Sequence, residues 1–342
     1  MNILLTVDPE IPVPPGLYGG IERIVDGLIN AYLEAGHKVT LCANKESKVP
    51  CRLVAWPGQK SQQWSDTLKN MAALTGLVMK GRFDVIHSYS RLAYMTALFP
   101  MRIPKIMSYQ REPSLGQIGK AVKLAKKGSL VFTGCSGYIA NQILQVAEAY
   151  TIYNFAPVRR YTATAEVGPD APLVFLGRLE HIKGPHIAIE VAKTSGRRLV
   201  IAGNLPPEAQ GYFDEKIRPY LDDRITYIGP VNDEQKNALL GQALAMLMPI
   251  QWNEPFGIVM AEAMACGTPV LGFPYGSVPE VVDNGVTGFV CADVREMVDR
   301  IGDLGAISRA GVRKMAEQRF TDKVIAGDYL ALYEKLISRS AK

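Results

Sequence analysis

Hydrophobic and polar positions follow two alternating patterns along the chain. Short runs that are almost wholly apolar recur, and longer segments with apolar residues at helical spacing separate them. Such runs are typical of strands buried on both faces of a parallel sheet, and the longer segments are typical of the helices that cover it. The first group of predicted strands covers 2–7, 39–43, 83–88, 105–109 and 130–136.

A second group of strands follows after a break in the pattern. Residues 157–172 hold three prolines and little apolar periodicity, which indicates a linker. A last helix is expected over 322–339. The alternation predicts an α/β protein with doubly wound parallel sheets. The second group of predicted strands covers 173–176, 198–203, 225–229, 244–249 and 268–273.

Two glutamates flank the start of a short predicted helix, 257–265. Pro255 and Gly257 indicate where that helix begins. Glu254 lies just before the first turn, and Glu262 lies about two turns further along, on roughly the same side. A helix N-terminus attracts anions, and carboxylates accept hydrogen bonds from hydroxyls. The pattern suits a nucleotide sugar, but it also suits a capped surface helix with two solvated glutamates.

A basic loop follows the strand 173–176. Arg178 comes directly after the strand, and Lys183 precedes the next predicted helix. Open α/β sheets bind ligands at the carboxyl ends of their strands. An arginine fork and a lysine on one loop suit a diphosphate, although two exposed basic residues would give the same pattern.

The loop after the first strand is rich in proline and glycine. It reads PEIPVPPGLYGGIER over 9–23, with Gly19 and Gly20 before the next helix. This is not the GxGxxG fingerprint of dinucleotide binding. The glycines would let the backbone approach a ligand, or would simply form the turn.

Together these motifs resemble the retaining nucleotide-sugar glycosyltransferases of family GT4, which have the GT-B fold. The resemblance rests on 173–184, on 254–262 and on GSVPEVVDNGVTGFV at 276–290, and it is weaker over 1–157. It implies two Rossmann-like doubly wound parallel-sheet domains that face a central cleft, with a C-terminal helix that crosses back to the first domain. The implied division is an acceptor domain over 1–157, a linker over 158–172, a donor domain over 173–321 and the C-terminal helix over 322–342.

The resemblance also implies roles for individual residues. Arg178, Lys183 and Glu254 would be catalytic: the two cations would stabilise the leaving diphosphate, and Glu254 would hold donor-sugar hydroxyls. Glu262 would bind the ribose. The other implied donor-binding residues are Gly19, Gly20, Gly203, Asn204, Val231, Phe256 and Gly257.

One position departs from the family pattern. Many members carry a histidine near the reacting sugar where this chain has Gln110. Glutamine does not titrate near neutral pH, so no general base is assigned. The family is often described with front-face attack, which needs no protein base. Gln110 and Arg111 are the acceptor-side candidates, although Arg111 could instead pair with Glu112. His87, on a predicted buried strand, is more typical of a structural histidine.

Charge is distributed unevenly. Residues 1–157 carry 17 Lys/Arg and 10 Asp/Glu, a net of +7, and the remainder carries a net of −2, which together give +5. Four lysines fall on one side of a predicted helix at 118–127. Such a helix suits weak contact with an anionic membrane or an acidic acceptor. A solvated basic face is favoured, because the apolar side lacks Trp and Phe. No basic stripe with interleaved aromatics indicates nucleic-acid binding.

The cysteines and the N-terminus bear on location and cofactors. Five scattered cysteines without CxxC spacing indicate a reducing compartment. No basic leader or long apolar run appears. A cytoplasmic protein is expected, with a peripheral position at the inner membrane face left open. No cofactor and no metal are expected, because histidines and cysteines do not cluster and no Asp-x-Asp motif lies in a suitable loop.

The expected function is therefore a metal-independent retaining glycosyltransferase. It would move a sugar from a UDP-, GDP- or ADP-sugar to a hydroxyl of a carbohydrate, lipid-linked or small-molecule acceptor. Two alternatives remain open. One is a sugar-nucleotide epimerase or phosphorylase on the same fold, and the other is a non-catalytic nucleotide-sugar binding protein.

Overall fold

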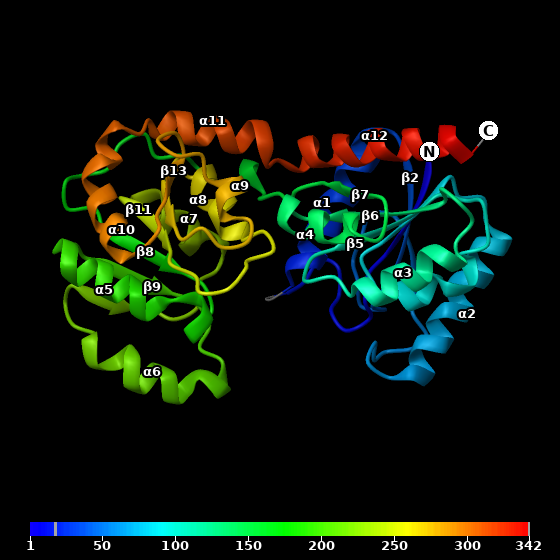
Figure 1. Cartoon of the computed structure of the whole chain (residues 1–342), viewed down its shortest axis with the longest axis horizontal. Coiled ribbons are helices and arrows are strands. Elements are labelled where there is room, and N and C mark those ends of the chain that lie inside the picture. The colour runs from blue at the N-terminus through cyan, green and yellow to red at the C-terminus, as the bar shows by residue number, and fades with distance from the viewer. Residues whose placement is uncertain (17–18, 341–342) are drawn as a thin grey trace. The chain divides into compact units, whose positions relative to one another are not determined.

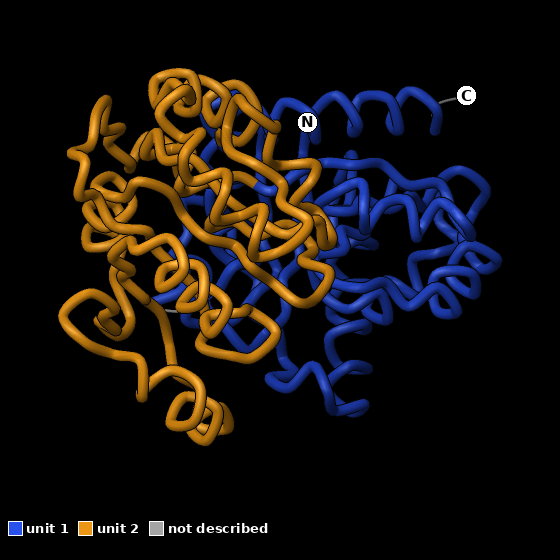
Figure 2. Tube along the Cα trace, turned by 60° about the vertical axis from the view of Figure 1, so that its left-hand side comes forward, with its two compact units in different colours: residues 1–154, 322–342 blue, residues 155–321 orange. Residues whose placement is uncertain are grey.

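The computed structural model of the protein describes residues 1–16 and 19–340. The chain forms two compact units, one of residues 1–154 with 322–342 and the other of residues 155–321 (Figure 2). Each unit is built around one parallel sheet, and Figure 1 labels its elements.

The first unit contains a seven-stranded sheet of order β3-β2-β1-β4-β5-β6-β7, in which every pair is parallel. The chain starts in the middle of the sheet, builds one edge, and then returns to build the other edge from β4. This is the doubly wound topology. The strands are β1 (Asn2–Thr6), β2 (Lys38–Ala43), β3 (Arg52–Ala55), β4 (Val85–Ser88), β5 (Lys105–Tyr109), β6 (Leu130–Gly134) and β7 (Ala149–Thr151).

The last helix of the chain belongs to this first unit. The α12 helix packs along α1, where the hydroxyls of Tyr32 and Tyr333 lie 2.9 Å apart in the core. This confirms that the C-terminal helix returns to the first domain. The helices of the unit are α1 (Gly20–Glu34), α2 (Trp64–Lys80), the 3₁₀ helix η1 (Leu92–Leu98), α3 (Leu115–Leu124), α4 (Gly137–Leu144) and α12 (Asp322–Ser340).

The second unit contains a six-stranded parallel sheet of order β10-β9-β8-β11-β12-β13. It is again doubly wound, from β8 outward. Its strands are β8 (Leu173–Leu176), β9 (Leu199–Ala202), β10 (Ile225–Tyr227), β11 (Ala245–Met248), β12 (Val270–Gly272) and β13 (Gly288–Val290).

Helices and short 3₁₀ turns connect these strands. The helices are α5 (Pro185–Ser195), α6 (Gln210–Lys216), α7 (Asp233–Gln242), α8 (Ile258–Ala265), α9 (Val278–Val281), α10 (Val294–Ile301) and α11 (Arg309–Arg319). The 3₁₀ turns are η2 (Val158–Arg160), η3 (His181–Lys183), η4 (Pro207–Ala209), η5 (Arg218–Tyr220) and η6 (Gly302–Ala306).

All ten predicted strands are present, and three short ones were not predicted. The strands β3, β7 and β13 lie at sheet edges, and β3 and β7 have no fully buried residue, so they lack a continuous apolar run. The predicted helix 257–265 begins one residue later, at Ile258. Gly257 is its N-cap, in the left-handed conformation with a φ of 70°.

The segment predicted to be a linker, 158–172, is part of the second unit. The Thr164 amide donates to the Cys266 carbonyl at 3.1 Å, and Tyr161 is buried. Side chains of neighbouring helices hold this segment through hydrogen bonds. It is not a strand of the sheet, and its polar sequence therefore shows no regular spacing of apolar residues.

The cysteines and the helices bear on the expected location. None of the five cysteines forms a disulfide, and four of them are buried. None of the described helices combines the length and the apolar character that a membrane crossing requires.

Candidate active site

The predicted donor residues gather at the carboxyl edge of the second sheet. Arg178 follows β8, Gly203 and Asn204 follow β9, Val231 follows β10, and the loop 249–257 follows β11. Neighbouring parallel strands bring these loops to one edge, which is where open α/β sheets bind ligands.

Glycines let these loops pack against one another. A Cβ atom on Gly203 would lie 1.8 Å from the Gly177 carbonyl oxygen, and one on Gly184 would lie 2.0 Å from the Pro249 carbonyl oxygen. Both glycines have positive φ, at 140° and 75°. No other residue fits these positions without moving the backbone.

Lys183 and Glu254 form a largely buried ion pair among the predicted donor residues. The Lys183 ammonium lies 2.6 Å from Glu254 Oε2, and the two side chains are only 15% and 12% exposed. The Trp252 indole N–H donates to the same oxygen at 3.0 Å, and the ammonium lies 4.5 Å from the centre of the Trp252 ring. A lysine and a glutamate 71 residues apart are thus joined into one charged cluster.

Arg178 is placed differently from Lys183. Its side chain is 43% exposed, and its guanidinium pairs with Glu180 at 3.0 Å. Across the described chain no contact joins Arg178 to Lys183; each cation has its own carboxylate. The sequence placed both on one loop, but it did not indicate that Glu180 would be a partner.

Glu262 lies on α8 and is 6% exposed. Its Oε1 accepts hydrogen bonds from the Tyr161 hydroxyl at 2.8 Å and from the Lys236 ammonium at 2.5 Å. Burial and the adjacent Glu262 raise the pKa of Tyr161. Sequence reasoning missed both partners: Tyr161 lies in the predicted linker, and Lys236 lies on α7, which has no apolar stripe.

The loop before α8 is held in place by the loop after β12. Ser277 donates through its amide to the Glu254 carbonyl and through its hydroxyl to the Phe256 carbonyl, both at 2.9 Å. Phe256 is buried against Phe320, with ring centres 5.7 Å apart. Phe256 and Gly257 therefore fix the position of the α8 N-terminus.

The first unit has its own pocket at the carboxyl ends of β1, β4 and β5. Its volume is about 450 Å³. It contains both predicted acceptor-side residues. Its lining includes Asp8, Gln62, Tyr89, Arg91, Gln110 and Arg111.

Asp8 is a pocket residue that sequence reasoning missed. It follows β1, and its Oδ1 accepts a hydrogen bond from the Arg91 amide at 3.2 Å. Burial, with a smaller contribution from Glu10, raises the pKa of Asp8 to about 6; Arg111 and Arg91 act in the opposite direction. Its place after the first buried strand was the available signal, because such positions line sites in α/β folds.

Only one of the two polar atoms of the Gln110 side-chain amide has a hydrogen-bond partner. Its Oε1 accepts from Asn154 Nδ2 at 2.7 Å, whereas its buried Nε2 has no hydrogen-bond partner within the described part of the chain. The Tyr89 hydroxyl, in contrast, is buried beside the hydroxyls of Ser108 and Tyr329. A donor without a partner on a residue that lines a pocket is suited to a hydroxyl oxygen of a ligand.

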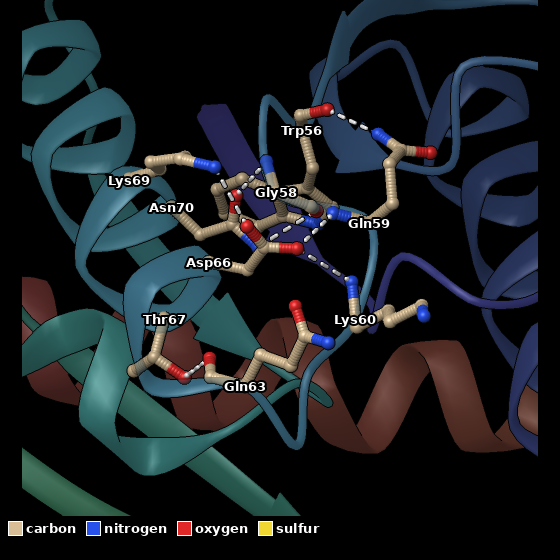
Figure 3. A network of polar contacts seen from close by, with 9 residues as sticks. All are labelled: Trp56, Gly58, Gln59, Lys60, Gln63, Asp66, Thr67, Lys69 and Asn70. Atoms are coloured by element: carbon tan, nitrogen blue, oxygen red, sulfur yellow. Dashed lines mark hydrogen bonds and ion pairs between the residues drawn. The ribbon is translucent and has the colours of Figure 1, made fainter.

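A polar network fixes the loop that carries Gln62 (Figure 3). The buried Asn70 bonds to the amide and the carbonyl of Gly58, at 2.8 and 3.1 Å. Asp66 Oδ2 accepts from the amides of Gln59 and Lys60. A Cβ on Gly58 would lie 2.6 Å from Asp66, so only glycine fits there.

The remaining predicted positions of the first unit are at the start of α1. Gly20 is the first residue of the helix, and a Cβ on Gly19 would lie 2.6 Å from Pro15. Leu17 and Tyr18, which come between Gly16 and Gly19 in the sequence, lie outside the described residues. Gly19 is therefore required by close packing, and its role toward a donor stays a prediction.

His87 is a structural residue of the first unit. It is fully buried, with Nδ1 2.5 Å from the Tyr333 hydroxyl and Nε2 2.6 Å from Ser108 Oγ. Burial lowers its pKa to about 3. It therefore stays neutral and ties α12 to the sheet.

The predicted basic helix, 118–127, lies three residues earlier in the chain than expected, at Leu115–Leu124. The α3 helix ends at Leu124, so Lys126 and Lys127 follow it. Ile118 and Ala121 are buried against the unit, whereas Leu124 is 60% exposed.

Within 1–16 and 19–340, no cluster of three or more His, Cys, Asp or Glu side chains has an arrangement that could hold a metal ion.

Comparison with known proteins places both halves of the chain in one class. A family model described as "Glycosyltransferase Family 4" matches 18–154, and a model described as "Glycosyl transferases group 1" matches 163–306. The second match contains Arg178, Lys183, Glu254 and Glu262.

Individual proteins agree with the family models. D-inositol 3-phosphate glycosyltransferase of Mycolicibacterium smegmatis is 32% identical over 54% of this chain, and the match spans 45% of that relative, about half its length. The crystal structure of AviGT4, a glycosyltransferase involved in avilamycin A biosynthesis, is 26% identical, with a TM-score of 0.76 and 98% of each chain covered.

A third protein, HepE of Anabaena, shares the fold. Its structure in complex with UDP and glucose is 20% identical to this chain, with a TM-score of 0.73, and covers 98% of this chain and all of its own. The two parallel sheets and the family matches agree with the resemblance seen in the sequence motifs. The chain belongs to the group 1, family 4 glycosyltransferases and has their GT-B fold.

Proposed function

We propose that the protein transfers a sugar from a nucleotide-diphosphate sugar to a hydroxyl acceptor, with retention of configuration and without a metal ion. The observation that carries this proposal is the buried Lys183–Glu254 pair at the carboxyl edge of the second sheet, inside the region that matches the group 1 family model.

The cations would act on the leaving diphosphate. In the transfer, the bond from the donor anomeric carbon to the phosphate oxygen breaks, and negative charge develops on the diphosphate. Lys183 and Arg178 would stabilise that charge, as preorganised cations do in a site with little water. Trp252 and Glu254 hold the Lys183 ammonium in one place, so little reorganisation is needed during the reaction.

The carboxylates would bind hydroxyl groups of the donor. Glu254 lies before the α8 N-terminus, and we assign it to the transferred sugar, together with Phe256 and Gly257. Glu262 lies further along α8, and we assign it to the ribose. Gly203, Asn204 and Val231 would contact the nucleotide mainly through backbone atoms, as would Gly19 and Gly20 of the first unit.

The acceptor would bind the pocket of the first unit. Asp8 accepts hydrogen bonds, whereas Gln110 Nε2 donates them, and together they suit a polyol. The acceptor oxygen would form the new bond to the anomeric carbon, and its proton would pass to the leaving diphosphate. This route needs no protein base, which agrees with a glutamine at position 110.

Known relatives suggest which ligands to try first. HepE is described in complex with UDP and glucose, so UDP-glucose is the first donor to test, followed by GDP- and ADP-glucose. The mycobacterial relative is named for an inositol phosphate acceptor. Arg91 and Arg111 beside the pocket suit an acceptor of that charge, and other carbohydrate, lipid-linked and small-molecule hydroxyls follow.

We further propose a cytoplasmic location and a weak contact between residues 118–127 and the membrane surface. Five cysteines without a disulfide support a reducing compartment. Exposed Val122 and Leu124 next to the lysines of this segment support the surface contact.

Purified protein should release nucleotide diphosphate from one of the three sugar donors and form a new glycoside with an added acceptor. Mass spectrometry identifies the product, and NMR of its anomeric proton gives the configuration. An epimerised donor or a sugar phosphate would instead indicate one of the other activities of this fold. Binding without turnover with every acceptor would indicate a binding protein, and an inverted product would refute the retaining mechanism.

Activity should survive removal of divalent metals. We expect EDTA-treated protein, dialysed into metal-free buffer, to keep most of its transfer rate, because Lys183 and Arg178 supply the positive charge. The same protein with added Mg²⁺ or Mn²⁺ serves as the control. Loss of activity on chelation, with recovery on adding either metal, would show that the proposal of metal independence is wrong.

A further inference from the structure

A second basic pocket lies at the opposite edge of the second sheet from the donor residues. Its volume is about 470 Å³, and its wall contains Asp170, Arg197, Arg198 and Arg224. These residues precede β8, β9 and β10, so they lie at the amino ends of three neighbouring parallel strands. The donor residues follow the carboxyl ends of the same strands.

Strand register places two of the arginines side by side. Leu173 on β8 pairs with Leu199 on β9, which pairs with Ile225 on β10. Arg198 and Arg224 each stand one residue before these positions. They therefore occupy equivalent places on adjacent strands, and Arg197 comes directly before Arg198.

Each of the three guanidinium groups is held by a backbone carbonyl. Arg197 donates to the Pro169 carbonyl and Arg198 to the Asp170 carbonyl, both at 2.6 Å, and Arg224 donates to the Gly196 carbonyl. A guanidinium has five N–H donors in a rigid fork, so one such bond orients it and leaves capacity for a ligand. The backbone thus fixes the direction of the positive charges.

The charge of this pocket is not balanced by its own residues. Three arginines and Asp170 give a net charge of +2 on the wall. Over the described part of the chain, no carboxylate lies within 4.0 Å of these three guanidinium groups. The nearby Asp222 is bound mainly by the amides of Ile225 and Arg224, which lower its pKa, and the positive charge of Arg224 lowers it further. Like charges held close together repel, and a bound anion would relieve that repulsion.

We propose that this pocket is a binding site for a small phosphorylated molecule, separate from the donor site. Arginine forks match the oxygen geometry of phosphate groups, and two or three of them on one wall suit a diphosphate or a sugar phosphate. The volume falls in the range of roughly 300–1,000 Å³ that small-molecule pockets have. A hollow of this size favours a compact ligand over the face of a macromolecule.

Calorimetric titration with inorganic pyrophosphate tests the site, because pyrophosphate is small enough for both this pocket and the donor site. Four proteins are compared at low salt: the wild type, Arg198→Gln with Arg224→Gln, Arg178→Ala with Lys183→Ala, and Arg295→Gln. Arg295 is an exposed arginine of the same unit, on α10, and serves as the matched control.

The proposal expects pyrophosphate to bind the Arg178/Lys183 double variant with an affinity close to that of one wild-type site. The Arg198/Arg224 variant should lose that site or weaken it at least about tenfold, which corresponds to one lost hydrogen bond to a charged group. Arg295→Gln should match the wild type. If all pyrophosphate binding disappears with Arg178 and Lys183, or persists unchanged without Arg198 and Arg224, the site does not exist.

Thermal unfolding separates binding from folding. Without anion, the Arg198/Arg224 variant should unfold at a temperature similar to the wild type, since it loses two bonds to carbonyls but also a like-charge pair. Pyrophosphate should raise the unfolding temperature of the Arg178/Lys183 variant and not that of a triple variant that also carries Arg224→Gln. If the Arg198/Arg224 variant does not fold, Arg224→Gln alone replaces it. An unchanged pyrophosphate affinity in Arg224→Gln would then overturn the proposal.

Discussion

The two candidate ligand sites, one in each unit, hold their carboxylates in different ways. In the second unit, Glu254 and Glu262 are buried, and each is joined to a lysine ammonium at 2.6 and 2.5 Å. In the first unit, Asp8 lines a pocket with an amide as its bonded partner, and its pKa is raised to about 6. The donor-side glutamates are thus in ion pairs, whereas Asp8 on the acceptor side has a pKa close to neutral pH.

This difference fits the ligands that we propose for each unit. A nucleotide diphosphate is negatively charged whenever it binds. Ammonium groups that buried carboxylates hold in place therefore present a preorganised field to it. An acceptor hydroxyl is neutral, and a carboxylate without a cationic partner is a strong acceptor for it. Substitutions in the two units should therefore affect different ligands.

The largest effect is expected for Lys183. Replacement by alanine removes a charge that faces the diphosphate and leaves Glu254 buried without its cation. Turnover at saturating donor should fall by about one to three orders of magnitude, or roughly 2–4 kcal/mol in the barrier. Initial rates of nucleotide release measure this, with circular dichroism to confirm the fold.

Lys193→Ala is the matched control, because Lys193 lies on α5 of the same unit and contacts the ring of Tyr220. Arg178→Ala should act in the same direction as Lys183→Ala, by less because Arg178 is more exposed. Wild-type turnover in Lys183→Ala would mean that this lysine does not hold the phosphates.

The next largest effects are expected for the two glutamates, because each is assigned to a different part of the donor. Glu262→Gln should weaken the nucleotide diphosphate and the intact sugar donor by similar factors, of about 1.5–3 kcal/mol for a lost charge-assisted bond. Glu254→Gln should leave the nucleotide diphosphate nearly unchanged and weaken the donor or its turnover.

Calorimetric titration of both variants with both ligands gives four affinities. The control is Glu190→Gln, an exposed glutamate on α5. Equal weakening of the bare nucleotide by Glu254→Gln and Glu262→Gln would contradict this division, and Glu254 would then belong to the nucleotide or to the fold.

The sequence predicted the fold well because buried parallel strands leave a strong local signal. Residues such as Ile3, Leu4 and Leu5 are wholly apolar and fully buried, so their run identifies β1 without knowledge of its partners. The short edge strand β3, with exposed residues at both ends, leaves no such signal. Tertiary pairing decided its conformation.

The site was only partly predictable, because contacts between distant parts of the chain also leave no local signal in the sequence. Glycines at 203 and 257 and the residues after each strand could be located from the chain alone. The pairs Lys183–Glu254 and Lys236–Glu262 join residues 71 and 26 positions apart, and spacing carries no information about them. Asp8 was missed because a single carboxylate after a strand is common, and its burial is set by the pocket.

Asp8 should make acceptor use depend on pH. With its pKa near 6, transfer at low acceptor concentration should rise through pH 6 as the carboxylate forms. Asp8→Asn should lack this rise and should lose about tenfold in kcat/KM for the acceptor at pH 8, from one hydrogen bond to a charged group. Nucleotide affinity should be unchanged.

Stability provides a separate test of the same pKa. Because the native state binds this proton more tightly than the unfolded chain, the free energy of unfolding falls as pH rises from 3.8 to about 6 and is then constant. Asp8→Asn removes this effect, so it should be more stable than the wild type at pH 8, by up to about 3 kcal/mol. The role of Asp8 would be contradicted if the variant were less stable than the wild type at pH 8 and its free energy of unfolding still fell as the pH rose to about 6.

The smallest effect is expected for Gln110→His, which restores the residue common at this position in the family. If the acceptor proton passes to the leaving diphosphate, a base at 110 adds little, and kcat should stay within about tenfold of the wild type, the range of one ordinary hydrogen bond. No new pH dependence should appear, because proton transfer through the imidazole is not required. Gln110→Ala is the control: it removes the bond from Asn154 and the unpartnered amide donor, and it should raise the acceptor KM with little change in kcat. A hundredfold gain in kcat with histidine, following its ionisation, would show that the reaction does use a base there and that front-face proton transfer is the wrong mechanism for this chain.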